Sequence, residues 1–154
     1  MKKTVTIAID IAELLYEIAN ETYLRHRSLK TDENYKQATH IYATADEEER
    51  AKILQSIDKS YAEICTELGE YYTGDSYTED NMNIILVLPN NYNDAATVDV
   101  AESIKAFLRS YAIMEWYIIV NKDEAKDYQV LCEKAKLQLR KALYRRKRPN
   151  RDNI

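Results

Sequence analysis

Apolar residues recur every three, four or seven positions in the last third of the chain, which is the spacing of one face of an α-helix. A polar turn at residues 121–124 interrupts this pattern. Before the turn, the apolar face carries Ala101, Ile104, Leu108, Tyr111, Ala112 and Ile119. After the turn, it carries Tyr128, Leu131, Cys132, Ala135, Leu139, Ala142 and Leu143. The pattern predicts two long helices over residues 98–148, folded back on each other as a hairpin.

The end of the first of these helices is apolar on almost every side. Residues 111–120 contain a single charge, Glu115. A helix of this composition should be covered on all sides. Glu115 could act as an acid or a base, but a buried carboxylate usually pairs with a cation. We therefore expect it to pair with an Arg or Lys on another helix or on a neighbouring subunit.

Two short stretches outside the hairpin have the pattern of β-strands. Residues 4–9 are rich in β-branched side chains, with Val5, Ile7 and Ile9 at every second position on one face. Residues 83–88 form an apolar run that ends at Pro89. The two strands could pair with each other as a small ribbon, or they could leave edges that pair between subunits. Residues 75–83, between the helical region and the second strand, are polar and predict a loop.

Capping signals place the remaining helices. Asp10 with Glu13 begins one helix directly after the first strand, and Thr44 with Glu47 begins another that extends over residues 46–68. A weaker pattern indicates a short helix at residues 32–42. The predicted fold is mainly α: a helical bundle built on a long C-terminal helical hairpin, with two short β-strands. We predict one helical domain over residues 1–144 and a basic tail over residues 145–154.

The charge of the chain is divided between its two ends. Residues 1–133 hold 13 Lys or Arg against 25 Asp or Glu, a net −12, whereas residues 134–154 hold 9 against 1, a net +8; together they give the overall −4. An acidic body with a basic arm suggests a charged partner or self-assembly through opposite faces.

Motifs for catalysis, metals or cofactors are missing from the sequence. His26 and His40 have no further His or Cys at metal-ligand spacing, and the two glycines of the chain do not form a phosphate-binding loop. Cys65 and Cys132 lie on apolar helix faces, where a free thiol behaves as a small hydrophobe. Neither a signal peptide nor an apolar run of about 20 residues is present. We expect a protein that is not an enzyme and that uses no metal, cofactor or membrane.

Basic residues crowd the C-terminal end of the second hairpin helix. The cluster comprises Arg140, Lys141, Tyr144, Arg145, Arg146, Lys147, Arg148 and Arg151. It could contact nucleic-acid phosphates, with the tyrosine as a stacking ring. It could equally be a solvated helix end favoured by the helix dipole, or it could dock on an acidic protein surface. The residues alone leave these three interpretations open.

The order of several segments from Leu88 to Pro149 is similar to that of a known protein family. Leu88-Pro89 precedes an Asn/Asp-rich turn, followed by residues 101–107, 111–117 and 124–128 and finally by Arg145-Arg146-Lys147-Arg148-Pro149. In this order residues 84–149 resemble the head–tail connector (adaptor) proteins of tailed bacteriophages. The N-terminal half of the chain takes no part in the resemblance.

The resemblance implies a structural virion protein that assembles as a ring beneath the portal and continues the DNA channel. It implies self-association, contacts with the portal and other neck or tail proteins, and DNA passing through the channel. It also implies that residues 142–154 dock on the portal, and that the protein assembles in the host cytoplasm and resides at the head–tail junction of the virion. The alternative is a small oligomeric helical protein that regulates or binds nucleic acid through its basic tail.

Overall fold

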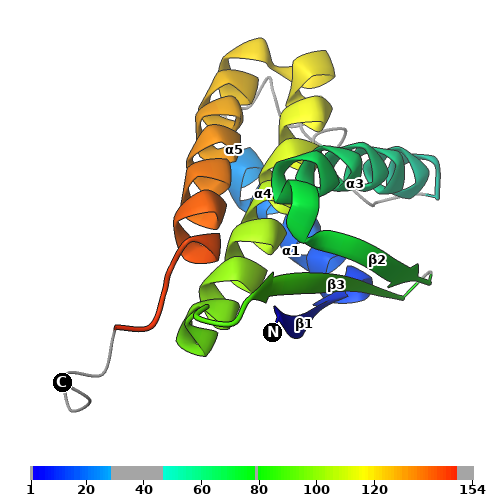
Figure 1. The fold of residues 1–154 in the computed structure, drawn as a ribbon. Helices are drawn as coiled ribbons and strands as arrows, with labels where there is room; N and C mark the ends of the chain where they lie inside the picture. The colour runs from blue at the N-terminus through cyan, green and yellow to red at the C-terminus, as the bar shows by residue number, and fades with distance from the viewer. Residues whose placement is uncertain (1, 29–46, 79, 149–154) are drawn as a thin grey trace, which may run out of the picture.

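The computed structural model of the chain describes residues 2–28, 47–78 and 80–148 (Figure 1). Four α-helices and three β-strands lie within these ranges. In chain order they are β1 (Lys2–Asp10), α1 (Ile11–Ser28), α3 (Glu47–Leu68), β2 (Tyr72–Tyr77), β3 (Asn81–Pro89), α4 (Thr97–Val120) and α5 (Lys122–Leu143), with 3₁₀ turns at Gly69–Tyr71 and Asp94–Ala96. The mainly helical fold with a small sheet is confirmed. His40, the weak helix at 32–42, Thr44 and the side chain of His26 lie outside the described residues.

The predicted C-terminal hairpin is formed by α4 and α5, which pack along each other (Figure 1). Asn121 separates them in an extended conformation, and its side chain caps α5 by accepting a hydrogen bond from the backbone N–H of Asp123 at 3.1 Å. At this end the buried rings of Tyr117 and Tyr128 stack, with their centroids 5.7 Å apart. One polar residue with a capping side chain is therefore enough to turn the chain.

The prediction that the end of α4 would be covered on all sides is wrong for two residues of its last turn. Ile119 is 81% exposed and Ile118 is 49% exposed. A helix of 24 residues is about 36 Å long. The hairpin extends beyond the sheet (Figure 1), and Ile119 lines an open hollow against α3 rather than packing into the core. Leu131, placed on the core face of α5 by the sequence pattern, is also partly exposed.

The two predicted strands pair within the chain. β1 and β3 are antiparallel in an unbroken register from Lys2 opposite Pro89 to Asp10 opposite Asn81. The strand that the sequence did not predict is β2, which adds to the other side of β3 and gives the order β1-β3-β2. The sequence predicts a loop over residues 75–83, which is wrong for residues 75–77 of β2 and 81–83 of β3. β2 was not predicted because it lacks an alternating apolar pattern. Tyrosine hydroxyls hold β2 instead: Tyr77 donates to Asp58 of α3 at 2.8 Å.

One face of the sheet and the helices share a single apolar core. Alternate residues of β1 and β3 are buried against the helices, which is the period of two expected for a half-covered sheet. Asp10 caps α1 as predicted, accepting a hydrogen bond from the backbone N–H of Glu13 at 3.2 Å. Gly69, at φ +56°, ends α3 in the left-handed conformation that favours glycine. Among the described helices, none combines the length and the apolar composition that a membrane span requires.

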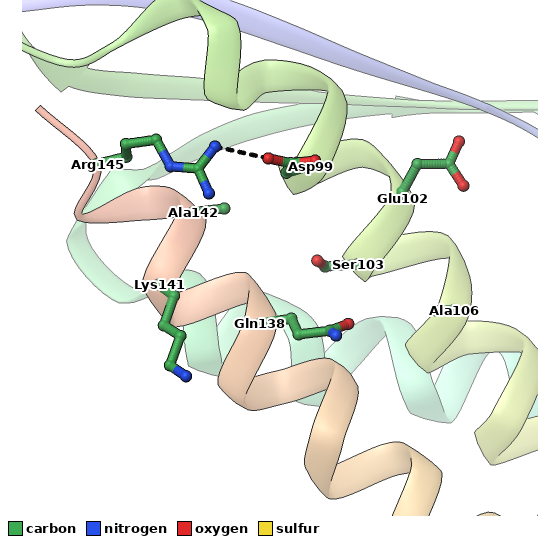
Figure 2. A pocket seen from close by; sticks show the side chains of 8 residues that line it. All are labelled: Asp99, Glu102, Ser103, Ala106, Gln138, Lys141, Ala142 and Arg145. Carbon is green, nitrogen blue, oxygen red and sulfur yellow. Dashed lines mark hydrogen bonds and ion pairs between the residues drawn. The ribbon is translucent and has the colours of Figure 1, made fainter. Parts of the chain in front are cut away.

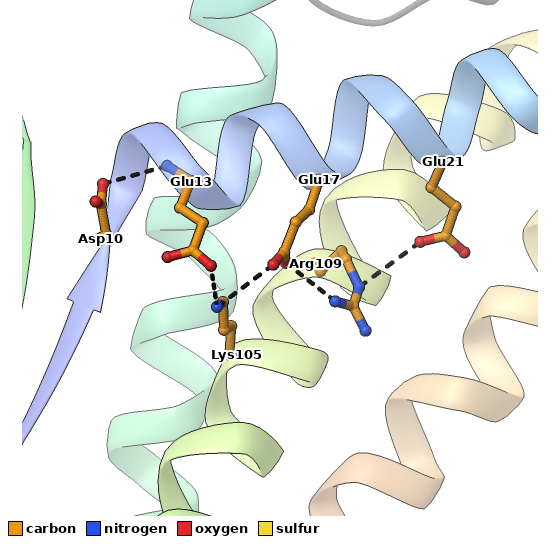
Figure 3. Close-up of polar contacts among 6 residues, drawn as sticks. All are labelled: Asp10, Glu13, Glu17, Glu21, Lys105 and Arg109. Atoms are coloured by element: carbon orange, nitrogen blue, oxygen red, sulfur yellow. Dashed lines mark hydrogen bonds and ion pairs between the residues drawn. The ribbon is translucent and has the colours of Figure 1, made fainter.

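Charged side chains fasten α1 to α4 (Figure 3). Lys105 Nζ lies 3.1 Å from Glu13 Oε1 and 3.4 Å from Glu17 Oε1. Arg109 bridges the next turn, with its guanidinium 3.0 Å from Glu17 and 3.6 Å from Glu21. Because the three glutamates are four residues apart, they project from one side of α1. These ion pairs between α1 and α4 neutralise part of the excess negative charge of residues 1–133.

Candidate docking surface at the end of the helical hairpin

The predicted basic cluster lies at the C-terminal end of α5 and in the segment that follows it. Arg140 and Lys141 belong to the last turn of α5, and residues 144–148 continue from it. Arg151 lies outside the described residues. The cluster lies at the end of the hairpin opposite to the turn between α4 and α5 (Figure 1).

The first residues after α5 are attached to the loop between β3 and α4. The backbone N–H of Asn93 donates to the carbonyl of Arg145 at 3.0 Å, and the N–H of Lys147 donates to the carbonyl of Asn91 at 2.8 Å. Tyr92 and Arg146 form a short antiparallel bridge between these bonds. Residues 145–147 therefore run along the body of the protein.

Acidic side chains of the body neutralise several cations of the cluster. Arg140 donates two hydrogen bonds to the carboxylate of Glu67, at 2.9 and 3.0 Å, and this pairing lowers the pKa of Glu67 below its usual value. Arg145 lies 2.7 Å from Asp99. Lys147 lies 3.7 Å from Asp94, whose pKa is lowered chiefly by its hydrogen bond from Lys3.

Three other members of the cluster face solvent or cap the helix. The Arg146 guanidinium donates to the carbonyl of Leu143 at 2.7 Å and lies over the ring of Tyr144, 5.8 Å from its centroid. Lys141 and Arg148 are exposed, and neither has an ion-pair partner among the described residues. The structure thus divides the cluster into cations held by the body and cations that point outward.

A groove of about 450 Å³ lies between α4 and α5 next to this segment (Figure 2). Asp99 and Glu102 line the α4 side, and Lys141 and Arg145 line the α5 side. The ion pair between Arg145 and Asp99 crosses one end of the groove (Figure 2). Ser103, Ala106 and Ala142 are small, so they leave the space between the helices unfilled. The groove has an acidic wall and a basic wall.

The outward face of α5 carries a second feature, which we call the α5 stripe. It consists of Val130, Lys134, Leu137, Lys141 and Tyr144. Its three apolar members are seven residues apart and are 67%, 48% and 64% exposed. Residues at this spacing lie on one side of a helix. The sequence did not predict the apolar part of this stripe because a stronger apolar face of the same helix forms the core. The seven-residue spacing was the signal that could have found it.

Glu115 pairs with a cation, as the sequence predicted. Its carboxylate accepts a hydrogen bond from the Ser56 hydroxyl at 2.5 Å and lies 3.6 Å from the ammonium of Lys59, both on α3. These residues line a hollow of about 240 Å³ together with Trp116 and Ile119. The described residues contain no group of three or more His, Cys, Asp or Glu arranged to hold a metal ion.

A tyrosine cluster joins α3 to β2. Tyr61 and Tyr72 both donate to the Asp75 carboxylate, Tyr72 at 2.8 Å. These bonds lower the pKa of Asp75, while burial and the bond to Asp75 raise the pKa of Tyr61. Neighbouring Cys65 is half-buried, and burial raises the pKa of its thiol. Raised tyrosine and cysteine pKa values favour the protonated forms, so the cluster fastens β2 rather than presenting a nucleophile.

No protein-family model, curated protein or solved structure matches the chain.

Proposed function

We propose that this protein is a structural virion protein, a head–tail connector (adaptor) that assembles as a ring beneath the portal and continues the DNA channel. The α5 stripe carries the proposal. Val130, Leu137 and Tyr144 present apolar surface to solvent along α5, and lysines lie between them. A stripe of this kind suits a protein surface that offers apolar contacts and acidic side chains.

A second copy of the chain offers such a surface. Residues 1–133 carry a net charge of −12, and three glutamates begin α3. α3 begins on the side of α4 away from α5 (Figure 1). Docking of the α5 stripe on the acidic body of the next copy would join two different surfaces. Contacts of this head-to-tail type generate closed rings when the rotation between copies closes.

The segment after α5 supports a protein partner more than a nucleic acid. Nucleic-acid affinity grows with the number of phosphates that free cations neutralise. Arg140, Arg145 and Lys147 are already paired with carboxylates of the body. The outward cation Arg148 remains for docking on the portal, which is the contact implied for residues 142–154 by the resemblance to connectors.

Native mass spectrometry across a range of protein concentrations tests this proposal. The wild type should form discrete assemblies larger than a dimer, and Leu137→Glu should remove them by placing a charge in the α5 stripe. Asn20→Glu is the matched control because Asn20 is exposed on α1, away from the stripe. Assemblies that persist in Leu137→Glu, or a wild type that never exceeds a dimer, would contradict docking through α5. Binding to DNA that falls steeply with salt would favour the nucleic-acid alternative.

A further inference from the structure

β1 is a long edge strand whose charged residues, Lys2, Lys3 and Asp10, lie only at its two ends. The sheet order leaves one side of β1 without a strand partner among the described residues. Natural edge strands are blunted by charges, prolines, bulges or short length. β1 is nine residues long, it pairs with β3 without a bulge, and residues 4–9 contain no charge and no proline. The other edge strand, β2, is shorter and its register shifts between Tyr72 and Gly74.

The face of the sheet that points away from the helices is also uncharged in its middle. Thr4, Thr6 and Ala8 are exposed on β1. Their partners on β3 are Val87, Ile85 and Asn83. In a chain with 31% charged residues, this face has charges on β1 only at the two ends of the strand, Lys2 and Asp10. An uncharged centre with opposite charges at the ends suits pairing with an identical strand.

We propose that β1 pairs with β1 of a second copy of this chain, antiparallel, about a two-fold axis at Thr6. The two three-stranded sheets then join into one continuous sheet. In this register Val5 lies opposite Ile7 of the second copy on the inner face, and the threonine hydroxyls meet at the axis. Aligned β-branched and threonine pairs of this kind stabilise antiparallel strands.

The charges at the ends of β1 select this register. Opposite residues must lie on the same face of the sheet, so the two-fold axis passes through a residue. Moving the axis by one residue therefore shifts the pairing register by two residues. An axis at Thr6 pairs all nine residues and sets Lys2 opposite Asp10 of the second copy, at both ends. An axis at Val5 leaves Asp10 without an opposite residue, and an axis at Ile7 leaves Lys2 without one.

Asp10 can take part in this pair while it caps α1. Its Oδ1 accepts the hydrogen bond from the backbone N–H of Glu13, and its other oxygen has no partner among the described residues. Lys2 is exposed. The opposite charges favour a second copy, because an identical strand always presents both charges in this order whereas an unrelated strand need not.

This contact goes beyond the proposed function. A two-fold contact uses the same surface on both copies and is complete at two, so it does not by itself build a ring. It lies on β1 and leaves the α5 stripe uncovered. The two contacts are therefore separable by mutation.

Sedimentation equilibrium of the full chain tests the β1 contact, with Leu137→Glu present in every sample so that assemblies through α5 do not mix with the β1 dimer. Thr6→Lys places two lysines opposite each other at the axis, where like charges oppose pairing. Because Thr6 is exposed, the variant should keep the wild-type far-UV circular dichroism spectrum while its dimer dissociation constant rises at least about tenfold, the effect of about 1.4 kcal/mol. Ser76→Lys is the matched control, since Ser76 is exposed on β2 at the opposite edge of the sheet.

A cysteine at the axis gives a second, direct readout. Oxidised Thr6→Cys should form a covalent dimer, whereas Ser76→Cys and the wild type should not. Lys2→Glu should weaken the dimer by setting a like charge opposite Asp10. A wild type that stays monomeric, or a dimer that Thr6→Lys leaves intact, would overturn the proposal. Failure of docking through α5 would appear separately, as assemblies that Leu137→Glu does not change.

Discussion

The contact between Ser56 and Glu115 allows a quantitative test of how α3 is held against α4. Ser56 is almost fully buried, and its hydroxyl donates to Glu115 Oε2 at 2.5 Å. Lys59 approaches the other carboxylate oxygen at 3.6 Å, but its side chain is 65% exposed. The carboxylate therefore has one buried donor and one solvated counter-charge.

The magnitudes of these two interactions differ. A hydrogen bond to a charged group contributes about 1.5–3 kcal/mol, whereas an exposed ion pair contributes about 0.2–1 kcal/mol. The Glu115 side chain is 24% exposed, so water can replace part of a lost bond. We therefore expect Ser56→Ala to lower the free energy of unfolding by about 1.5–2 kcal/mol. Lys59→Ala should lower it by less than about 1 kcal/mol.

Urea denaturation measures both changes, followed by the fluorescence of Trp116, the single tryptophan of the chain. Thr66→Ala is the matched control: Thr66 is exposed on the same helix, and its hydroxyl donates only to the carbonyl of Ala62. This variant should stay within about 0.5 kcal/mol of the wild type. If Lys59→Ala destabilises the protein as much as Ser56→Ala, or if Ser56→Ala matches Thr66→Ala, the hydrogen bond between Ser56 and Glu115 is not the main contact that holds α3 against α4.

Three further predictions follow from the structure. First, the pair with Arg140 lowers the pKa of Glu67, so this pair stabilises the fold above pH about 5 and loses its effect as the pH falls through the folded-state pKa. Wild type and Arg140→Gln should therefore differ in urea midpoint at pH 7, and the difference should shrink as the pH falls below the ordinary Glu pKa of 4.5. Second, burial raises the pKa of the Cys132 thiol to about 12. A disulfide reagent at pH about 8 should therefore label Cys132 only in denaturant. Rapid labelling of Cys132 in the folded protein would contradict its burial. Third, Gly69→Ala should destabilise the protein by about 1 kcal/mol in thermal melts, because the φ of Gly69 is +56°. Gly74 has no positive φ and open space around an added carbon, so Gly74→Ala should be neutral or slightly stabilising. Equal effects of the two substitutions would contradict the importance of the left-handed conformation at Gly69.

The sequence by itself determined the elements whose signals are local. The hairpin, the first strand with its Asp10 cap and the run before Pro89 follow from periodicity and capping within a few residues. These signals work because the side chains of one helical turn or one strand face set the local structure directly. The pairing of Glu115 with a lysine was also predictable, because a lone carboxylate among apolar residues requires a counter-charge.

The tertiary structure alone decided which distant groups meet. β2 was not predicted because tyrosine hydroxyls join it to α3, Tyr61 to Asp75 and Tyr77 to Asp58, and these contacts leave no apolar pattern in the strand. The basic cluster looked uniform in the sequence, yet Arg140 pairs with Glu67, which lies 73 positions earlier, while Lys141 points outward. Local composition cannot separate two adjacent cations of this kind. Only packing fixes which of them lies within reach of a carboxylate of α3 and which remains on the surface for a partner.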